Sequence, residues 1–321
     1  MEKDKLLATL SENINNVFSV DGFKKILNRA NSLTGFDTMN RILIHQQYDN
    51  AYDIKVADEW ELKNRHVRKN TKPIYIFMPI TDVKYKDVES GVIIPDNELD
   101  LNSVELHEAI SRGLIEKTKD IVDIQVIATY DIRQTYSNGN NKYTVTKPIV
   151  NMKSAFELFV GITSGSIQSS TVSKYDIDNN ILYLRKNSSK DEKYSTVVQA
   201  ISQFICSYKL ASVAKTVGIG ITDWTEYELQ LIEDSLAYSI LTLLRRNPDI
   251  DLGAVNTTSN DKLLAILNMV DILILDVTYR VKFEGGLNAV DMASHIEKER
   301  KSEALLNIME ANMVLNKMKG A

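Results

Sequence analysis

The sequence has few of the side chains that metal-dependent and thiol-dependent proteins use. Its 321 residues include one cysteine, Cys206, and four histidines that lie far apart along the chain. No Cys/His spacing matches a structural zinc site, and a single cysteine cannot form an internal disulfide. We therefore predict a cytoplasmic protein of reducing surroundings, without a metal ion or other cofactor.

Long apolar runs and chain-breaking residues are also scarce. The most apolar stretch, residues 263–277, is interrupted by Asn268, Asp271 and Asp276 and is shorter than the roughly 20 residues of a membrane span. It predicts a buried helix and no membrane partner. Residues 1–16 lack the apolar core of a secretory signal. With only 5 prolines and 13 glycines, the chain is expected to form closely packed domains without long linkers.

The composition is otherwise that of an ordinary globular chain, with 44% hydrophobic residues, 25% charged residues and a net charge of −5. Apolar residues at helical or alternating spacing predict the secondary structure. We expect helices at 4–18, 22–33, 37–48, 154–163, 191–216, 223–246, 259–282 and 288–319, and strands at 74–78, 121–130 and 181–184. Pro79 is expected to end the first strand, and Asn138-Gly139 predicts a hairpin turn. The fold class is therefore α+β, with a mostly helical second half that includes a small β-sheet.

Five segments, in this order, match the motifs of one known family. Residues 36–47 are similar to a Y-S-x-x-N-x-x-L-I-x-x-Q helix, and 60–72 to a W-x-x-x-G-R-x-V-x-K-G-E-K turn, with Asn64 and Asn70 in place of the two glycines. Asparagine also tolerates a positive φ, so the turn is expected to persist. The apolar strand 73–80, an F-D-x-x-Q-T segment at 130–135 and the strand at 174–184 complete the set. In these segments the chain resembles the ArdC-type antirestriction family of plasmids and phages.

The family joins an N-terminal single-stranded-DNA-binding domain to a zincin-like metallopeptidase domain. The resemblance therefore implies three parts in this chain. We expect the DNA-binding-like domain, helical and β, at residues 1–150, a degenerate zincin-like domain at 151–250, and a C-terminal helical extension packed on it at 251–321.

The expected metallopeptidase helix lacks the residues of its chemistry. A zincin needs two histidines at positions i and i+4 to hold zinc, and a glutamate between them as general base. By spacing, this H-E-x-x-H segment corresponds to Gln199-Ala200-Ile201-Ser202-Gln203. The resemblance places Asp234 where the family has its carboxylate ligand, and one acid cannot hold zinc alone. We interpret the domain as catalytically dead, without a metal site.

A basic segment follows Trp60. Between Glu61 and Lys72 the sequence contains the cations Lys63, Arg65, Arg68, Lys69 and Lys72 and the single acid Glu61. Cations that bind phosphates beside aromatic rings that stack on unpaired bases are typical of single-stranded nucleic acid binding. The candidate DNA-binding residues are these five cations with Trp60, Asn40 and Tyr48. The alternative left open is that the charges form a solvated face and the aromatic rings belong to the core.

These observations favour a non-catalytic ArdC-like protein of a phage or plasmid. By resemblance, it would bind single-stranded DNA or engage a host restriction or defence protein in the host cytoplasm. The alternative is a protein-interaction scaffold without DNA binding, and an active metallopeptidase is a distant third. The C-terminal helix offers an apolar stripe, Leu305, Ile308, Met309, Met313 and Leu315, for self-association or for a partner.

Overall fold

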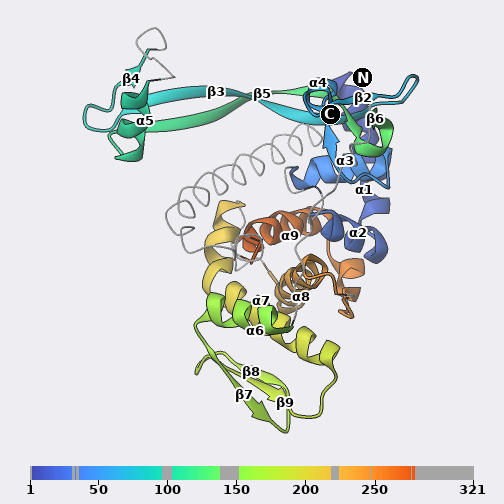
Figure 1. Cartoon of the computed structure of the whole chain (residues 1–321), viewed down its shortest axis with the longest axis vertical. Helices are drawn as coiled ribbons and strands as arrows, with labels where there is room; N and C mark the ends of the chain where they lie inside the picture. The colour runs from blue at the N-terminus through green and yellow to red at the C-terminus, as the bar shows by residue number, and fades with distance from the viewer. Residues whose placement is uncertain are drawn as a thin grey trace.

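The structure, a computed structural model, describes residues 2–30, 33, 36–95, 103–137, 152–217, 224–246, 248–275 and 277–278. Figure 1 shows a helical body with a long two-stranded arm at one end and a small sheet at the other. The predicted hairpin at Asn138-Gly139, the helix at 288–319 and the expected domain boundary near residue 150 lie outside the described residues. The α+β class is as predicted from the sequence.

Three helices open the chain, as expected: α1 (Lys3–Val17), α2 (Val20–Ala30) and α3 (Thr38–Gln47). The side chain of Asp37 caps α3 by accepting a hydrogen bond from the backbone N–H of Asn40 at 3.0 Å. Residues 38–44 of α3 are all buried, so this helix is enclosed on every side in its first two turns. It lies between the arm and the helices of the second half (Figure 1).

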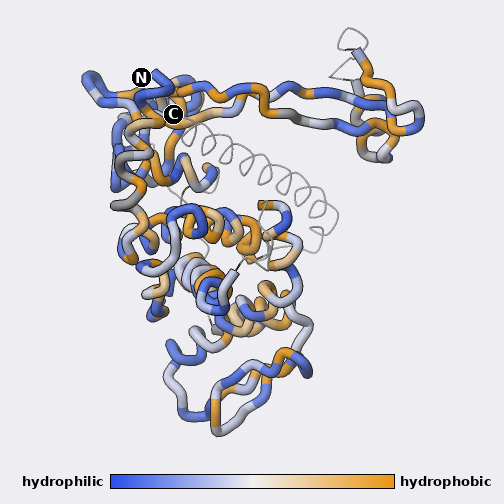
Figure 2. The backbone as a smooth tube through the Cα atoms, turned by 180° about the vertical axis from the view of Figure 1, so that it is seen from behind, coloured by the Kyte–Doolittle hydropathy of each residue, from blue (hydrophilic) through white to orange (hydrophobic). Residues whose placement is uncertain are grey.

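The arm is an antiparallel ribbon of β3 (Ile74–Asp87) and β5 (Ile115–Asp131). Together with β1 (Ile54–Lys55) and β4 (Ile93–Ile94) it forms a sheet of order β1-β5-β3-β4, and α5 (Val104–Ser111) packs near its tip. Figure 2 shows both apolar and polar stretches along the arm. The expectation that Pro79 ends the strand was wrong: Pro79 pairs with Ile124 inside β3, beside a shift in register at Ile80/Thr81. A proline is tolerated there because β4 pairs with β3 only at Tyr85 and Lys86. At Pro79 the outer edge of β3 has no neighbouring strand, so no backbone N–H donor is needed on that edge.

A short two-stranded sheet lies at the base of the arm. The helix α4 (Ala57–Leu62) leads into β2 (Arg65–Val67), which pairs antiparallel with β6 (Thr135–Ser137). The 3-10 helix η2 (Ile132–Gln134) connects the end of β5 to β6. This sheet therefore brings the segment after Trp60 next to the segment after Tyr130.

The second half is mostly helical, as predicted. It contains α6 (Met152–Thr163), α7 (Lys190–Thr216), α8 (Glu226–Leu243), η4 (Gly253–Thr257) and α9 (Asn260–Leu273). A sheet of β7 (Ser166–Ser170), β9 (Ile181–Arg185) and β8 (Lys174–Asp176) lies between α6 and α7 in sequence, with β7 parallel to β9. The apolar run at 263–277 contributes the buried helix α9, as expected, and Asn268 on it is only 4% exposed.

One apolar core joins the two halves of the chain. The N-terminal helices contribute Leu6, Phe23 and Ile42 to the same buried cluster as Ile232 and Ile266 of α8 and α9. Arg41 of α3, which is 3% exposed, pairs with Asp271, and Thr38 donates to the same carboxylate at 2.8 Å. Within the described residues, no helix is both long enough and apolar enough to cross a membrane.

Candidate functional site

The predicted cations lie in one segment, within β2 and on either side of it, which we call the basic turn (residues 63–72). Lys63, Arg68, Lys69 and Lys72 are exposed, and Arg65 is half-buried. The guanidinium groups are fixed: Arg65 Nε donates to Thr135 Oγ1 at 2.8 Å and Arg68 Nε to the Thr135 carbonyl at 3.3 Å. In the described part of the chain, the side chains of Lys69 and Lys72 make neither an ion pair nor a hydrogen bond, so their charges are available to a ligand.

Both asparagines that replace the family's glycines have a left-handed backbone. Asn64 has a φ of 55° and Asn70 a φ of 61°. Asparagine adopts this conformation more readily than other residues with a Cβ. The expectation that the turn persists despite these replacements is confirmed.

The segment Tyr130–Thr135 supports the basic turn from beneath. Asp131, which is fully buried, accepts hydrogen bonds from the backbone N–H groups of Tyr52, Asp53 and Arg133 at 2.6, 3.1 and 2.9 Å. The side chain of Gln134 accepts from the Asp131 N–H at 2.7 Å and donates to the Lys72 carbonyl at 2.9 Å. The D-x-x-Q-T segment at 131–135 therefore fixes both ends of the basic turn by hydrogen bonds.

Asn40, predicted as a DNA contact, is instead buried against the arm. It is 3% exposed, and its side-chain amide bonds the backbone of Phe77 and the carboxylate of Asp37. Both the N–H and the C=O of its amide are used in these bonds, so no group remains for a strand of DNA.

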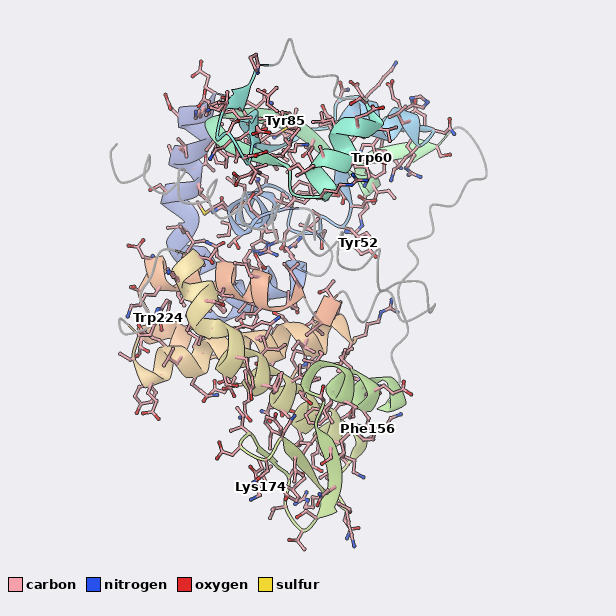
Figure 3. The ribbon with its side chains drawn as sticks, turned by 90° about the vertical axis from the view of Figure 1, so that its left-hand side faces the viewer. Tyr52, Trp60, Tyr85, Phe156, Lys174 and Trp224 are labelled. Carbon is pink, nitrogen blue, oxygen red and sulfur yellow. The ribbon has the colours of Figure 1, made fainter. Side chains whose placement is uncertain are left out.

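Trp60 also differs from the prediction. Trp60, labelled in Figure 3, has no exposed surface, and its Nε1 donates to the Tyr130 carbonyl at 2.8 Å. Lys55 Nζ lies 4.9 Å from the centroid of its ring. Tyr48 is half-buried against the small apolar cluster that includes Ile44. Trp60 therefore cannot stack on a base, because its ring is fully buried.

The sequence reasoning missed an exposed ring on the partner strand. Tyr136 of β6 is 44% exposed and pairs with His66 of β2, with their ring centroids 5.7 Å apart. Together they place two exposed or half-exposed rings among the cations of the basic turn. The signal was the pairing of β2 with β6, which brings residue 136 beside residue 66 and which no local pattern in the sequence reveals.

The segment 199–203, which the resemblance aligns with the metallopeptidase motif, lies on α7. The side chain of Gln199 is exposed, and Ala200 is 1% exposed and packs in the core. Gln203 lies near the carboxylate of Glu233 on α8 and lowers its pKa. A zinc or manganese site does not fit these residues, because the amides of Gln199 and Gln203 are poor metal donors and Ala200 has no donor atom.

The carboxylates of α8 lie in surroundings that disfavour their charge. Burial raises the pKa of Glu233, a hydrogen bond from Gln203 partly opposes the shift, and the neighbouring Asp234 adds to it. Burial also raises the pKa of Asp234, whose Oδ1 accepts from the Gln230 amide at 3.1 Å. Burial raises the pKa of the Cys206 thiol to about 12, which leaves it un-ionised and a poor nucleophile at neutral pH. Among the described residues, no group of three or more His, Cys, Asp or Glu side chains is placed to hold a metal ion.

No protein-family profile matches the chain, and no curated protein matches it. Among solved structures, it is similar to the metal-free antirestriction ArdC protein from plasmid R388, with a TM-score of 0.44 and 10% identity over 77% of this chain and 85% of that one. The Mn(II)-bound structure of the same protein gives a TM-score of 0.42, with the same identity and coverage.

Proposed function

We propose that this chain is a non-catalytic ArdC-like protein that binds single-stranded DNA at the basic turn. The observation that carries the proposal is the exposure of the cations beside the His66–Tyr136 ring pair. Phosphates bind the cations, and an unpaired base stacks on an exposed ring with a free energy of roughly 1–3 kcal/mol. A duplex keeps its bases stacked within itself, so the rings favour single strands.

The biological role follows from this binding. A protein that covers single strands can shield incoming or replicating DNA of a phage or plasmid from host restriction. Expression in a restricting host should raise the number of transconjugants obtained with unmodified DNA, and a variant of the basic turn should not. Equal transconjugant numbers with and without the protein would contradict this role.

A salt-titrated gel shift with matched single-stranded and double-stranded oligonucleotides tests the binding step. We expect retarded single strands at low salt, weaker retardation of the duplex, and loss of both as salt rises, because bound cations are released when lysines neutralise phosphates. No retardation of the single strand at low salt would overturn the proposal.

A protein-interaction scaffold is the second candidate, and a specific surface favours it. Five apolar side chains at the tip of the arm are each more than half exposed: Val88, Val92, Ile93, Val104 and Leu114. Exposed apolar groups gathered in one place mark interaction surfaces in many proteins. If the gel shift is negative, this tip is the surface on which to test partner binding.

The proposed absence of metal catalysis has its own test. We propose that α7 and α8 keep only a packing role, since Gln199, Ala200 and Gln203 stand where the resemblance places the two ligands and the base, and Asp234 alone remains at the carboxylate position. Protein purified without chelator and dialysed against zinc or manganese should carry far less than one ion per chain by elemental analysis. Stoichiometric metal that is lost in a Glu233→Gln or Asp234→Asn variant would contradict this account.

A further inference from the structure

A second basic site lies at the other end of the molecule. A pocket of about 540 Å³ lies between α6, β7, the end of β9 and the first turns of α7. In Figure 3 the label of Phe156, which lines it, is far from that of Trp60 beneath the basic turn. The pocket is therefore separate from the proposed DNA-binding surface.

Part of the pocket lining is apolar. The half-buried ring of Phe156 on α6 lines it, together with Ile167 of β7 and Leu184 of β9. Its volume exceeds that of a single phosphate and lies within the range of small-molecule sites, roughly 300–1,000 Å³. An inorganic anion would leave this apolar wall uncovered, so the wall indicates a ligand with a flat apolar part.

The lining also includes four cations: Arg185, Lys186, Lys190 and Lys193. Glu192 pairs with Arg185 at 3.0 Å and accepts from the Ser189 N–H at 2.6 Å, so it offsets only one of the four charges. Lys193 Nζ reaches the Lys186 carbonyl at 3.4 Å, which holds its ammonium near the rim. Within the described residues, Lys186 and Lys190 have no ion-pair partner.

We propose that this pocket binds a nucleotide, with its phosphate at Lys186, Lys190 and Lys193 and its base against Phe156. Lysine is a common point-charge ligand for phosphate, and all three lysines line the pocket, Lys186 directly after β9 and the other two on the first turns of α7. Base stacking on a ring uses the apolar wall. The nucleotide is either free in solution or part of a single strand, and both sources share this chemistry.

The pocket is tested by calorimetric titration of the full chain with adenosine monophosphate, inorganic phosphate and adenosine. We expect adenosine monophosphate to bind more tightly than either of its parts. Lys190→Ala/Lys193→Ala should weaken its binding roughly tenfold, the effect of losing about 1.4 kcal/mol of charge-assisted contact. Phe156→Leu should weaken it about fivefold while leaving phosphate binding unchanged.

A control variant tests whether the loss of binding is specific to the pocket. Lys5→Ala/Lys215→Ala removes the same charge from exposed positions on α1 and α7 outside the pocket, and should bind like the wild type. Absence of saturable binding, equal affinity of the Lys190/Lys193 variant, or tighter binding of phosphate alone or of a glutamate-rich peptide would overturn the proposal.

A short oligo(dA) distinguishes the two sources. If it competes with adenosine monophosphate in a variant of the basic turn, Lys69→Ala/Lys72→Ala, the pocket accepts a nucleotide within a strand; if it does not, the ligand is the free nucleotide. Either result supports the pocket as a nucleotide site. The pocket proposal and the DNA-binding proposal can fail independently, because their tests change different lysines.

Discussion

Asn40 and Phe77 exchange two hydrogen bonds between α3 and the arm. The Asn40 Nδ2 donates to the Phe77 carbonyl oxygen, and the Phe77 N–H donates to Asn40 Oδ1, both at 2.8 Å. Two turns further along α3, Gln47 makes the same exchange with Tyr75, at 2.7 and 2.9 Å. The two amides pair with alternate residues along the free edge of β3, in place of a neighbouring strand. The N-x-x-L-I-x-x-Q pattern is therefore a means of fixing the arm to the body.

Removal of the Asn40 amide should destabilise the fold without changing a DNA contact. Asn40→Ala leaves the Phe77 N–H and C=O buried without partners, and we expect a loss of about 3 kcal/mol in the free energy of unfolding, measured with urea. Gln47→Ala should cost about 1 kcal/mol, because Gln47 is half-buried and water can replace it. Unchanged stability together with lost DNA binding in Asn40→Ala would show that Asn40 contacts the ligand after all.

The backbone of the basic turn predicts how substitutions at Asn70 behave. Its φ of 61° costs an alanine about 1 kcal/mol and a glycine almost nothing, because a Cβ meets the following carbonyl in this conformation. We expect Asn70→Gly to match the wild type in thermal unfolding and Asn70→Ala to melt at a lower temperature. Asn187, exposed and with no positive φ, is the matched control, where alanine should be tolerated. Equal melting of the glycine and alanine variants at position 70 would refute this reasoning.

Glu233 should make stability depend on pH. Its pKa is raised above the ordinary 4.5 by burial, so ionisation costs the folded state more than the unfolded state. The cost is absent at pH below 4.5, where both states are protonated, and grows as the pH rises through the raised pKa. Glu233→Gln removes it and keeps an amide partner for Gln203. The variant should therefore be more stable than the wild type at neutral pH.

The pH profile of unfolding separates this cause from general packing effects. The difference between Glu233→Gln and the wild type should disappear in acid. Glu226→Gln, at an exposed position in the first turn of the same helix, should lower stability slightly at neutral pH, because an acid is favourable there. An advantage of Glu233→Gln that persists unchanged in acid would contradict the proposed cause.

The order of the elements could be predicted from the sequence because their apolar spacing is regular. Helices such as α3 and α7 and the strand β9 lie within a few residues of their predicted bounds, whereas α9 ends at Leu273 and not at residue 282. The length of the arm could not be predicted: beyond Ile80, β3 and β5 stabilise each other through cross-strand pairs such as Tyr85 with Lys117. Pairing of this kind depends on register between segments far apart in sequence, which local patterns do not contain.

The roles of the motif residues were the least predictable part of the site. Spacing located the basic turn and its two left-handed asparagines, and the exposed lysines agree with it. Asn40 and Trp60 were assigned to the ligand because polar and aromatic residues suit DNA, yet both are buried supports. A buried amide and an exposed one look alike in a sequence. Only the pairing of β2 with β6 reveals Tyr136 as the ring that faces outward.

The most direct test of DNA binding at the basic turn is the salt dependence of single-strand affinity, measured by fluorescence anisotropy. Lys69→Ala/Lys72→Ala removes two exposed charges that hold no part of the fold. Each phosphate contact contributes about 0.7 to the slope of log affinity against log salt, so we predict weaker binding and a slope shallower by about 1.4. The control, Lys5→Ala/Lys215→Ala, should keep the wild-type slope. A folded Lys69/Lys72 variant with unchanged affinity and slope would contradict the assignment of the basic turn as the DNA-binding surface.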